Sequence, residues 1–117
     1  MLEGVGVNGR ASILEHILGA ANMRVFARVN IPVGRGNAAI KDGTLPKVLD
    51  GFMGRVQPEA VYFGLEAGHR TMFVAFDLKD AADIPVIFEP LFQAFDAEVH
   101  WQPVMNQADL QKGLSSL

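Results

Sequence analysis

The chain has 117 residues and a mass of 12.7 kDa; half of the residues are hydrophobic, and 13 acidic against 10 basic side chains give a formal net charge of −3. This length allows one domain with a single core, and its hydrophobicity and weak negative charge argue against a disordered chain and against nonspecific nucleic-acid binding. With no cysteine there is no disulfide, thiol nucleophile or Cys-ligated metal, and no apolar run reaches the roughly 20 residues that span a bilayer. We therefore expect a compact, soluble, cytoplasmic domain without a nucleic-acid or membrane partner.

Residues 1–22 differ in composition from the rest of the chain. Several glycines precede a few apolar residues at helical spacing, and Ser12 with Glu15 has the spacing of a capping box. We predict an N-terminal extension with a short helix and assign the domain to residues 23–117. A secretory signal peptide is the alternative, but Glu15 and His16 interrupt the apolar stretch that it would need.

The domain itself alternates between two patterns. Strand-like segments alternate apolar and polar residues, and helix-like segments repeat apolar residues three or four positions apart. Gly43 and Pro46 divide the first helical region, which follows a turn at residues 34–37, and Pro90 inside the second helix removes the usual partner of the Val86 carbonyl. The predicted elements are strand 23–31, helix 45–56, strands 60–66 and 71–78, helix 84–95, strand 97–104 and a short helix after Asn106.

This order, βαββαβ, predicts an α+β fold of the ferredoxin-like type: a four-stranded antiparallel sheet with two helices on one face. The other face is left without a covering element. Strand 71–78 is apolar on both faces, and Phe26, Tyr62 and Trp101 add rings to neighbouring strands. We therefore expect a homodimer in which the open faces of two sheets cover each other.

Several short motifs carry a family resemblance. They are residues 68–71 (Gly-His-Arg-Thr), Glu89 with Pro90, and the run 103–105 (Pro-Val-Met) followed by Asp109 and Leu110. Over residues 23–105 the chain resembles the dimeric α+β barrel superfamily, and the motifs resemble a family of short proteins of unknown function within it. The superfamily includes cofactor-free quinol monooxygenases, haem-degrading monooxygenases, muconolactone isomerases and stress-responsive proteins, so the fold alone does not select a function.

The strand alternation predicts which side chains share the open face. The set expected to face the helices is Val25, Ala27, Val29, Val61, Phe63, Leu65, Met72, Val74, Phe76, Val99 and Trp101. The set expected on the open face is Arg24, Phe26, Arg28, Asn30, Tyr62, Glu66, Thr71, Phe73, Asp77, Glu98, His100 and Gln102. A few rings beside polar groups are typical of a small-molecule pocket, and equally of an ordinary solvated surface.

Five open-face residues are the candidates for function. His100 is the candidate for acid–base work because imidazole titrates near neutrality, and Tyr62 could donate a proton or a hydrogen bond. Arg28 and Asn30 would orient a substrate oxygen, and Phe73 would form an apolar wall. The structural alternative is that His100 lies between polar neighbours and that Arg28 pairs with a carboxylate.

No cofactor or metal is expected. His16, His69 and His100 lack metal-ligand spacing, and residues 34–37 (Gly-Arg-Gly-Asn) lack the rest of a dinucleotide or phosphate-loop motif. We expect a small homodimeric binding or accessory protein with a small-molecule pocket. The alternative is a cofactor-independent monooxygenase or isomerase acting on a small aromatic or lactone. A haem-degrading enzyme would need Asn30, His100 and Trp101 together, yet His100 and Trp101 are neighbours on one strand and should point to opposite faces.

Overall fold

The structure, a computed structural model, describes residues 22–117. The predicted N-terminal helix lies outside these residues. In chain order the elements are β1 (Met23–Ile31), α2 (Val33–Lys41), α3 (Thr44–Val56), β2 (Ala60–Glu66), β3 (His69–Leu78), α4 (Asp83–Phe95), β4 (Glu98–Pro103) and α5 (Gln107–Leu114).

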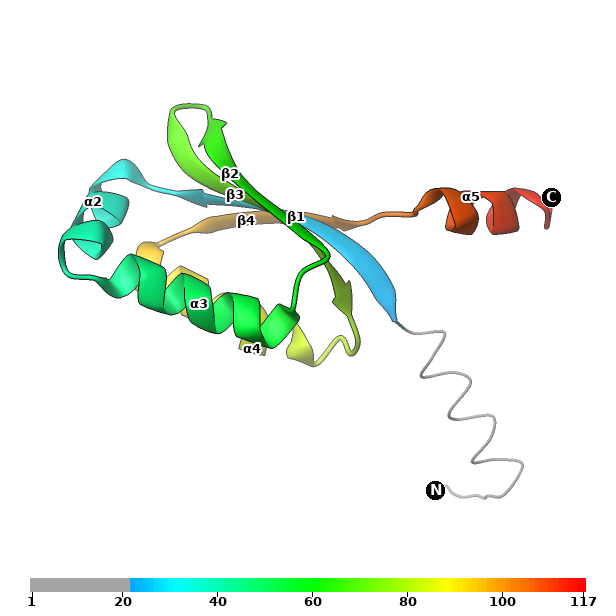
Figure 1. Cartoon of the computed structure of the whole chain (residues 1–117), viewed down its shortest axis with the longest axis horizontal. Helices are drawn as coiled ribbons and strands as arrows, with labels where there is room; N and C mark the ends of the chain where they lie inside the picture. The colour runs from blue at the N-terminus through cyan, green and yellow to red at the C-terminus, as the bar shows by residue number, and fades with distance from the viewer. Residues whose placement is uncertain (1–21) are drawn as a thin grey trace, which may run out of the picture.

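The four strands form one sheet in the order β2-β3-β1-β4, with every neighbouring pair antiparallel. β3 therefore lies between the parallel strands β1 and β2, and β1 lies between β3 and β4. The helices α3 and α4 lie side by side on one face of the sheet (Figure 1). The predicted α+β class and four-stranded antiparallel sheet are confirmed, and the arrangement is compatible with a ferredoxin-like fold.

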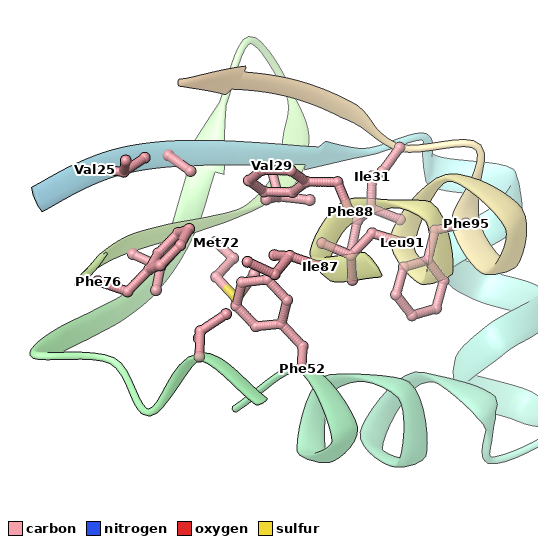
Figure 2. Packing of buried hydrophobic residues seen from close by; sticks show 14 of the residues in the cluster. Val25, Val29, Ile31, Phe52, Met72, Phe76, Ile87, Phe88, Leu91 and Phe95 are labelled. Atoms are coloured by element: carbon pink, nitrogen blue, oxygen red, sulfur yellow. The ribbon is translucent and has the colours of Figure 1, made fainter. Parts of the chain in front are cut away.

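The core fills the space between the sheet and the two helices. Val25, Ala27 and Val29 are buried on β1, and their cross-strand partners on β3 are buried with them. Phe76 of β3 lies between two other rings, 6.3 Å from Phe52 of α3 and 6.2 Å from Phe88 of α4, both edge-on. Figure 2 shows these side chains meeting between the three elements. Burial of each such ring contributes about 1.5–3 kcal/mol, so the contact holds both helices to the sheet.

The predicted turn at residues 34–37 is wrong, because α2 begins at Val33. Pro32 ends β1 with a φ of −55°, and the N–H of Gly36 already donates to its carbonyl at 2.9 Å. Gly36 is buried against Ile31 and the guanidinium of Arg70, where a Cβ would not fit without a shift. A close tertiary contact thus explains a glycine inside this helix.

The carbonyl that Pro90 frees finds a partner on the neighbouring helix. α4 continues through Pro90 to Phe95. The guanidinium of Arg55, near the end of α3, donates to the Val86 carbonyl over 3.1 Å. This hydrogen bond replaces the one that proline removes and links the two helices.

The hairpin between β2 and β3 is tighter than expected. His69 pairs with Glu66 and belongs to β3, so the turn consists of Ala67 and Gly68 alone. Both have positive φ, 53° and 81°. Two consecutive positive φ values are the signature of a type I′ turn, whose twist matches that of the strands.

The C-terminal helix α5 projects away from the sheet (Figure 1). Its start is fixed by the capping box of Asn106 and Asp109, and Asp109 also accepts a hydrogen bond from Arg24 of β1 at 3.2 Å. None of its residues is buried. Among residues 22–117, no helix has both the length and the hydrophobicity needed to cross a bilayer.

Candidate functional site

The open face of the sheet carries the candidate site, and residues 22–117 place no helix over it (Figure 1). Four of the five predicted site residues form one row across the strands. Phe73 pairs with Tyr62 on one side and with Arg28 on the other, and Arg28 pairs in turn with His100. The fifth, Asn30, lies two residues from Arg28 and so on the same face. The sequence alternation thus brings all five to one surface.

A polar cluster occupies the middle of this face. The carboxylate of Glu66 accepts hydrogen bonds from the guanidinium of Arg28 and from the side-chain amide of Asn30, the latter at 3.0 Å. Asn30 also donates to the hydroxyl of Thr71 at 2.8 Å, and that hydroxyl donates to the His69 carbonyl. Arg28 is therefore neutralised within its own chain.

The cluster keeps Glu66 ionised. Chiefly the hydrogen bond from Asn30, and then the contact with Arg28, hold the pKa of the Glu66 carboxyl below its ordinary value, against the opposing effect of partial burial. A carboxylate that stays charged keeps Arg28 and Asn30 oriented toward it across the face. The cluster is thus a fixed group of donors and acceptors at neutral pH.

His100 and Tyr62 lie at opposite ends of the row. His100 is half-exposed, with its Nε2 3.4 Å from a carboxylate oxygen of Glu98. Tyr62 is 71% exposed on the edge strand β2. Three strand spacings separate their backbones by about 14 Å. The two side chains of one chain are therefore too far apart to act on the same bond of a small substrate.

The three residue types of a haem-degrading site do not come together. His100 pairs with Arg28 and shares the open face, whereas Trp101 pairs with Ala27 and lies on the helix side. There Trp101 borders a shallow hollow with Phe88 and Phe92 of α4. Within residues 22–117 no group of three or more His, Asp or Glu side chains is arranged to hold a metal ion. His16 lies outside the described residues.

The alternation places Phe63 and Leu65 on the helix side, as expected, but not in the core. Both lie beyond the cover of α3 and are 61% and 76% exposed. With Leu45 and Leu49 of α3 and Val29 and Ile31 of β1 they border an apolar groove of about 330 Å³. This groove could not be predicted from strand alternation, which shows the face that a residue occupies but not where the covering helix ends.

Comparison of this chain with protein-family models, curated proteins and solved structures finds no match.

Proposed function

We propose that the protein is a small homodimeric binding or accessory protein of the dimeric α+β barrel type, with a ferredoxin-like unit in each chain. The observation that carries this proposal is the open sheet face. Phe26 and Phe73 are half-buried there, and Tyr62 is 71% exposed. Full burial of an exposed ring contributes about 1.5–3 kcal/mol, so Tyr62 would gain most of this and the other two rings a smaller part. A second copy of the same face covers these rings without any other partner.

The space between the two sheets would form the ligand pocket. Phe73 supplies an apolar wall, and Arg28 and Asn30 supply donors beside it. Because Glu66 already neutralises Arg28, an anionic ligand would have to displace that carboxylate. The charge balance favours an uncharged ring that bears one or two hydrogen-bonding groups. A cytoplasmic location stays a prediction from the sequence.

Sedimentation velocity of the full chain at micromolar concentration tests the dimer. We expect the wild type to sediment as a dimer and Phe73→Arg to sediment as a monomer, because the substitution puts a second cation beside Arg28 at the contact. Phe92→Arg is the matched control, since Phe92 is partly exposed on α4, on the helix side. It should remain a dimer. A monomeric wild type, or equal dissociation of both variants, would refute the proposal.

A cofactor-independent monooxygenase or isomerase is the second candidate. It is favoured by one feature: Arg28 and His100 are direct cross-strand partners, so a guanidinium and an imidazole face the same space. Arg28 would donate a hydrogen bond to a phenol or lactone oxygen, and His100 would move a proton. Mass spectrometry of a mixture of phenols, quinols and lactones after incubation tests this candidate. The enzyme candidate is supported if the wild type converts one of these compounds and His100→Ala abolishes the reaction while the dimer stays intact. Unchanged turnover in the variant removes His100 from the mechanism.

A further inference from the structure

Within residues 22–117, Arg70 is the one charged residue that borders the apolar groove beside α3. Arg70 lies on β3, with Ile31 of β1 and Leu65 of β2 as its cross-strand partners, and so belongs to the helix side of the sheet. It borders the groove together with apolar side chains of β1, β2 and α3. The accessible surface of the groove is otherwise almost entirely apolar.

Within the part of the chain that the structure describes, the contacts of Arg70 are to uncharged oxygens. Its guanidinium donates to the side-chain oxygen of Asn37 at 2.8 Å and, more weakly, to the Val33 carbonyl at 3.4 Å. In residues 22–117 no carboxylate lies within ion-pair distance of it, whereas Arg28 and Arg35 each contact one. Guanidinium has five N–H donors in a planar fork that fits a carboxylate, and two contacts leave several of them unused.

The absence of a side chain at Gly36 leaves room for the guanidinium of Arg70. A Cβ at this position would come within 2.5 Å of Nη1 of Arg70, so any side chain there would displace the charged group. Asn37, the next residue of α2, holds the same guanidinium from the other nitrogen. The start of α2 therefore positions a cation beside the groove.

We infer that this groove binds a small apolar monocarboxylate, with its hydrocarbon part against the apolar walls and its carboxylate on Arg70. The groove volume of about 330 Å³ is at the lower end of the range of about 300–1,000 Å³ for small-molecule sites, which suits a short ligand. An eight-carbon fatty acid or a phenylpropionate is of this size. The inference goes beyond the proposed function, because the groove lies on the opposite side of the sheet and is built within one chain.

Titration of the full chain with octanoate, at millimolar concentrations below its micellar range, tests the inference. Amide shifts in ¹H–¹⁵N spectra report the binding site. We expect saturable shifts at residues 63–71, and at least about tenfold weaker binding of octanamide, which has the same size but no charge. Equal binding of octanoate and octanamide, or no saturable shift at the groove, would overturn the inference. The latter result includes the case in which residues 1–21 or a second copy fill the groove.

Two variants separate the charge from the fold. Arg70→Met should weaken octanoate binding at least about tenfold, and Gly36→Ala should weaken it by displacing the guanidinium while keeping its charge. Lys47→Met is the control, because it removes an exposed cation from α3 and should leave the affinity unchanged. If Arg70→Met does not fold, the Gly36→Ala variant serves as the test. A folded Gly36→Ala variant that binds octanoate as tightly as the wild type contradicts the inference. Sedimentation of the same samples keeps the two proposals apart, since a monomer that binds octanoate refutes only the dimer.

Discussion

Replacement of Phe76 by leucine tests how the core holds the helices to the sheet. Phe76 is 1% exposed and makes edge-on contacts with Phe52 and Phe88. Each aromatic pair contributes about 0.5–1.5 kcal/mol beyond burial, and leucine keeps the position apolar but is smaller and has no ring. Loss of both pairs should therefore lower the free energy of unfolding by about 1–3 kcal/mol.

Urea unfolding followed by circular dichroism measures this change. With a denaturant slope of about 1–3 kcal/mol per molar, the midpoint should fall by about 1 M. Phe92→Leu is the matched control, because Phe92 is 36% exposed and makes neither of these ring contacts. Its midpoint should change little, within the range of about 0.5 kcal/mol that surface substitutions show. Equal shifts in the two variants would refute the assignment of Phe76 as the centre of the core.

Three further predictions concern single interactions. Because Asn30 holds the pKa of Glu66 low, the carboxylate stabilises the fold above the ordinary glutamate pKa of about 4.3, and this stabilisation is lost as the pH falls. Glu66→Gln should therefore make the melting temperature less dependent on pH in the acidic range. Melting temperatures of the wild type and the variant that fall in parallel with pH would contradict this. Asn106→Ala should destabilise α5 by about 0.5–2 kcal/mol and speed amide hydrogen exchange in this helix. The global unfolding midpoint should not move, since no residue of α5 is buried; a lower midpoint would show that α5 packs against the rest of the domain. Arg55→Met removes the donor to the Val86 carbonyl and should lower the free energy of unfolding by about 0.5–1.5 kcal/mol, measured by thermal unfolding. An unchanged melting temperature would mean that this hydrogen bond does not stabilise α4.

Most of the fold could be predicted because periodicity and turn residues agree along the chain. Val25, Ala27 and Val29 alternate so regularly that both the strand and its buried face follow from the sequence. The start of α2 could not be predicted in this way. Gly34 and Gly36 disfavour a helix by propensity, and only the folded structure shows the close contact of Gly36 with Ile31 and Arg70 that explains a glycine there.

The site was predictable as a face but not as a set of contacts. Alternation put Arg28, Asn30 and Glu66 together, yet only the sheet order shows that Glu66 reaches across β3 to the other two. Likewise, His100 and Tyr62 share a face, but the two strands between them set a separation that the sequence does not contain. Contacts between distant strands depend on topology, and periodicity carries no information about it.

The central claim is that the open sheet face is covered by a second copy of the chain. Isotope-filtered nuclear Overhauser spectroscopy on a mixture of labelled and unlabelled full-length protein tests it most directly. The account predicts intermolecular contacts from the rings of Phe26 and Phe73, and none from Phe52 or Phe88, which lie in the core of each chain. The claim would be contradicted if the rings of Phe26 and Phe73 show contacts within one chain only and no intermolecular signal at millimolar protein concentration.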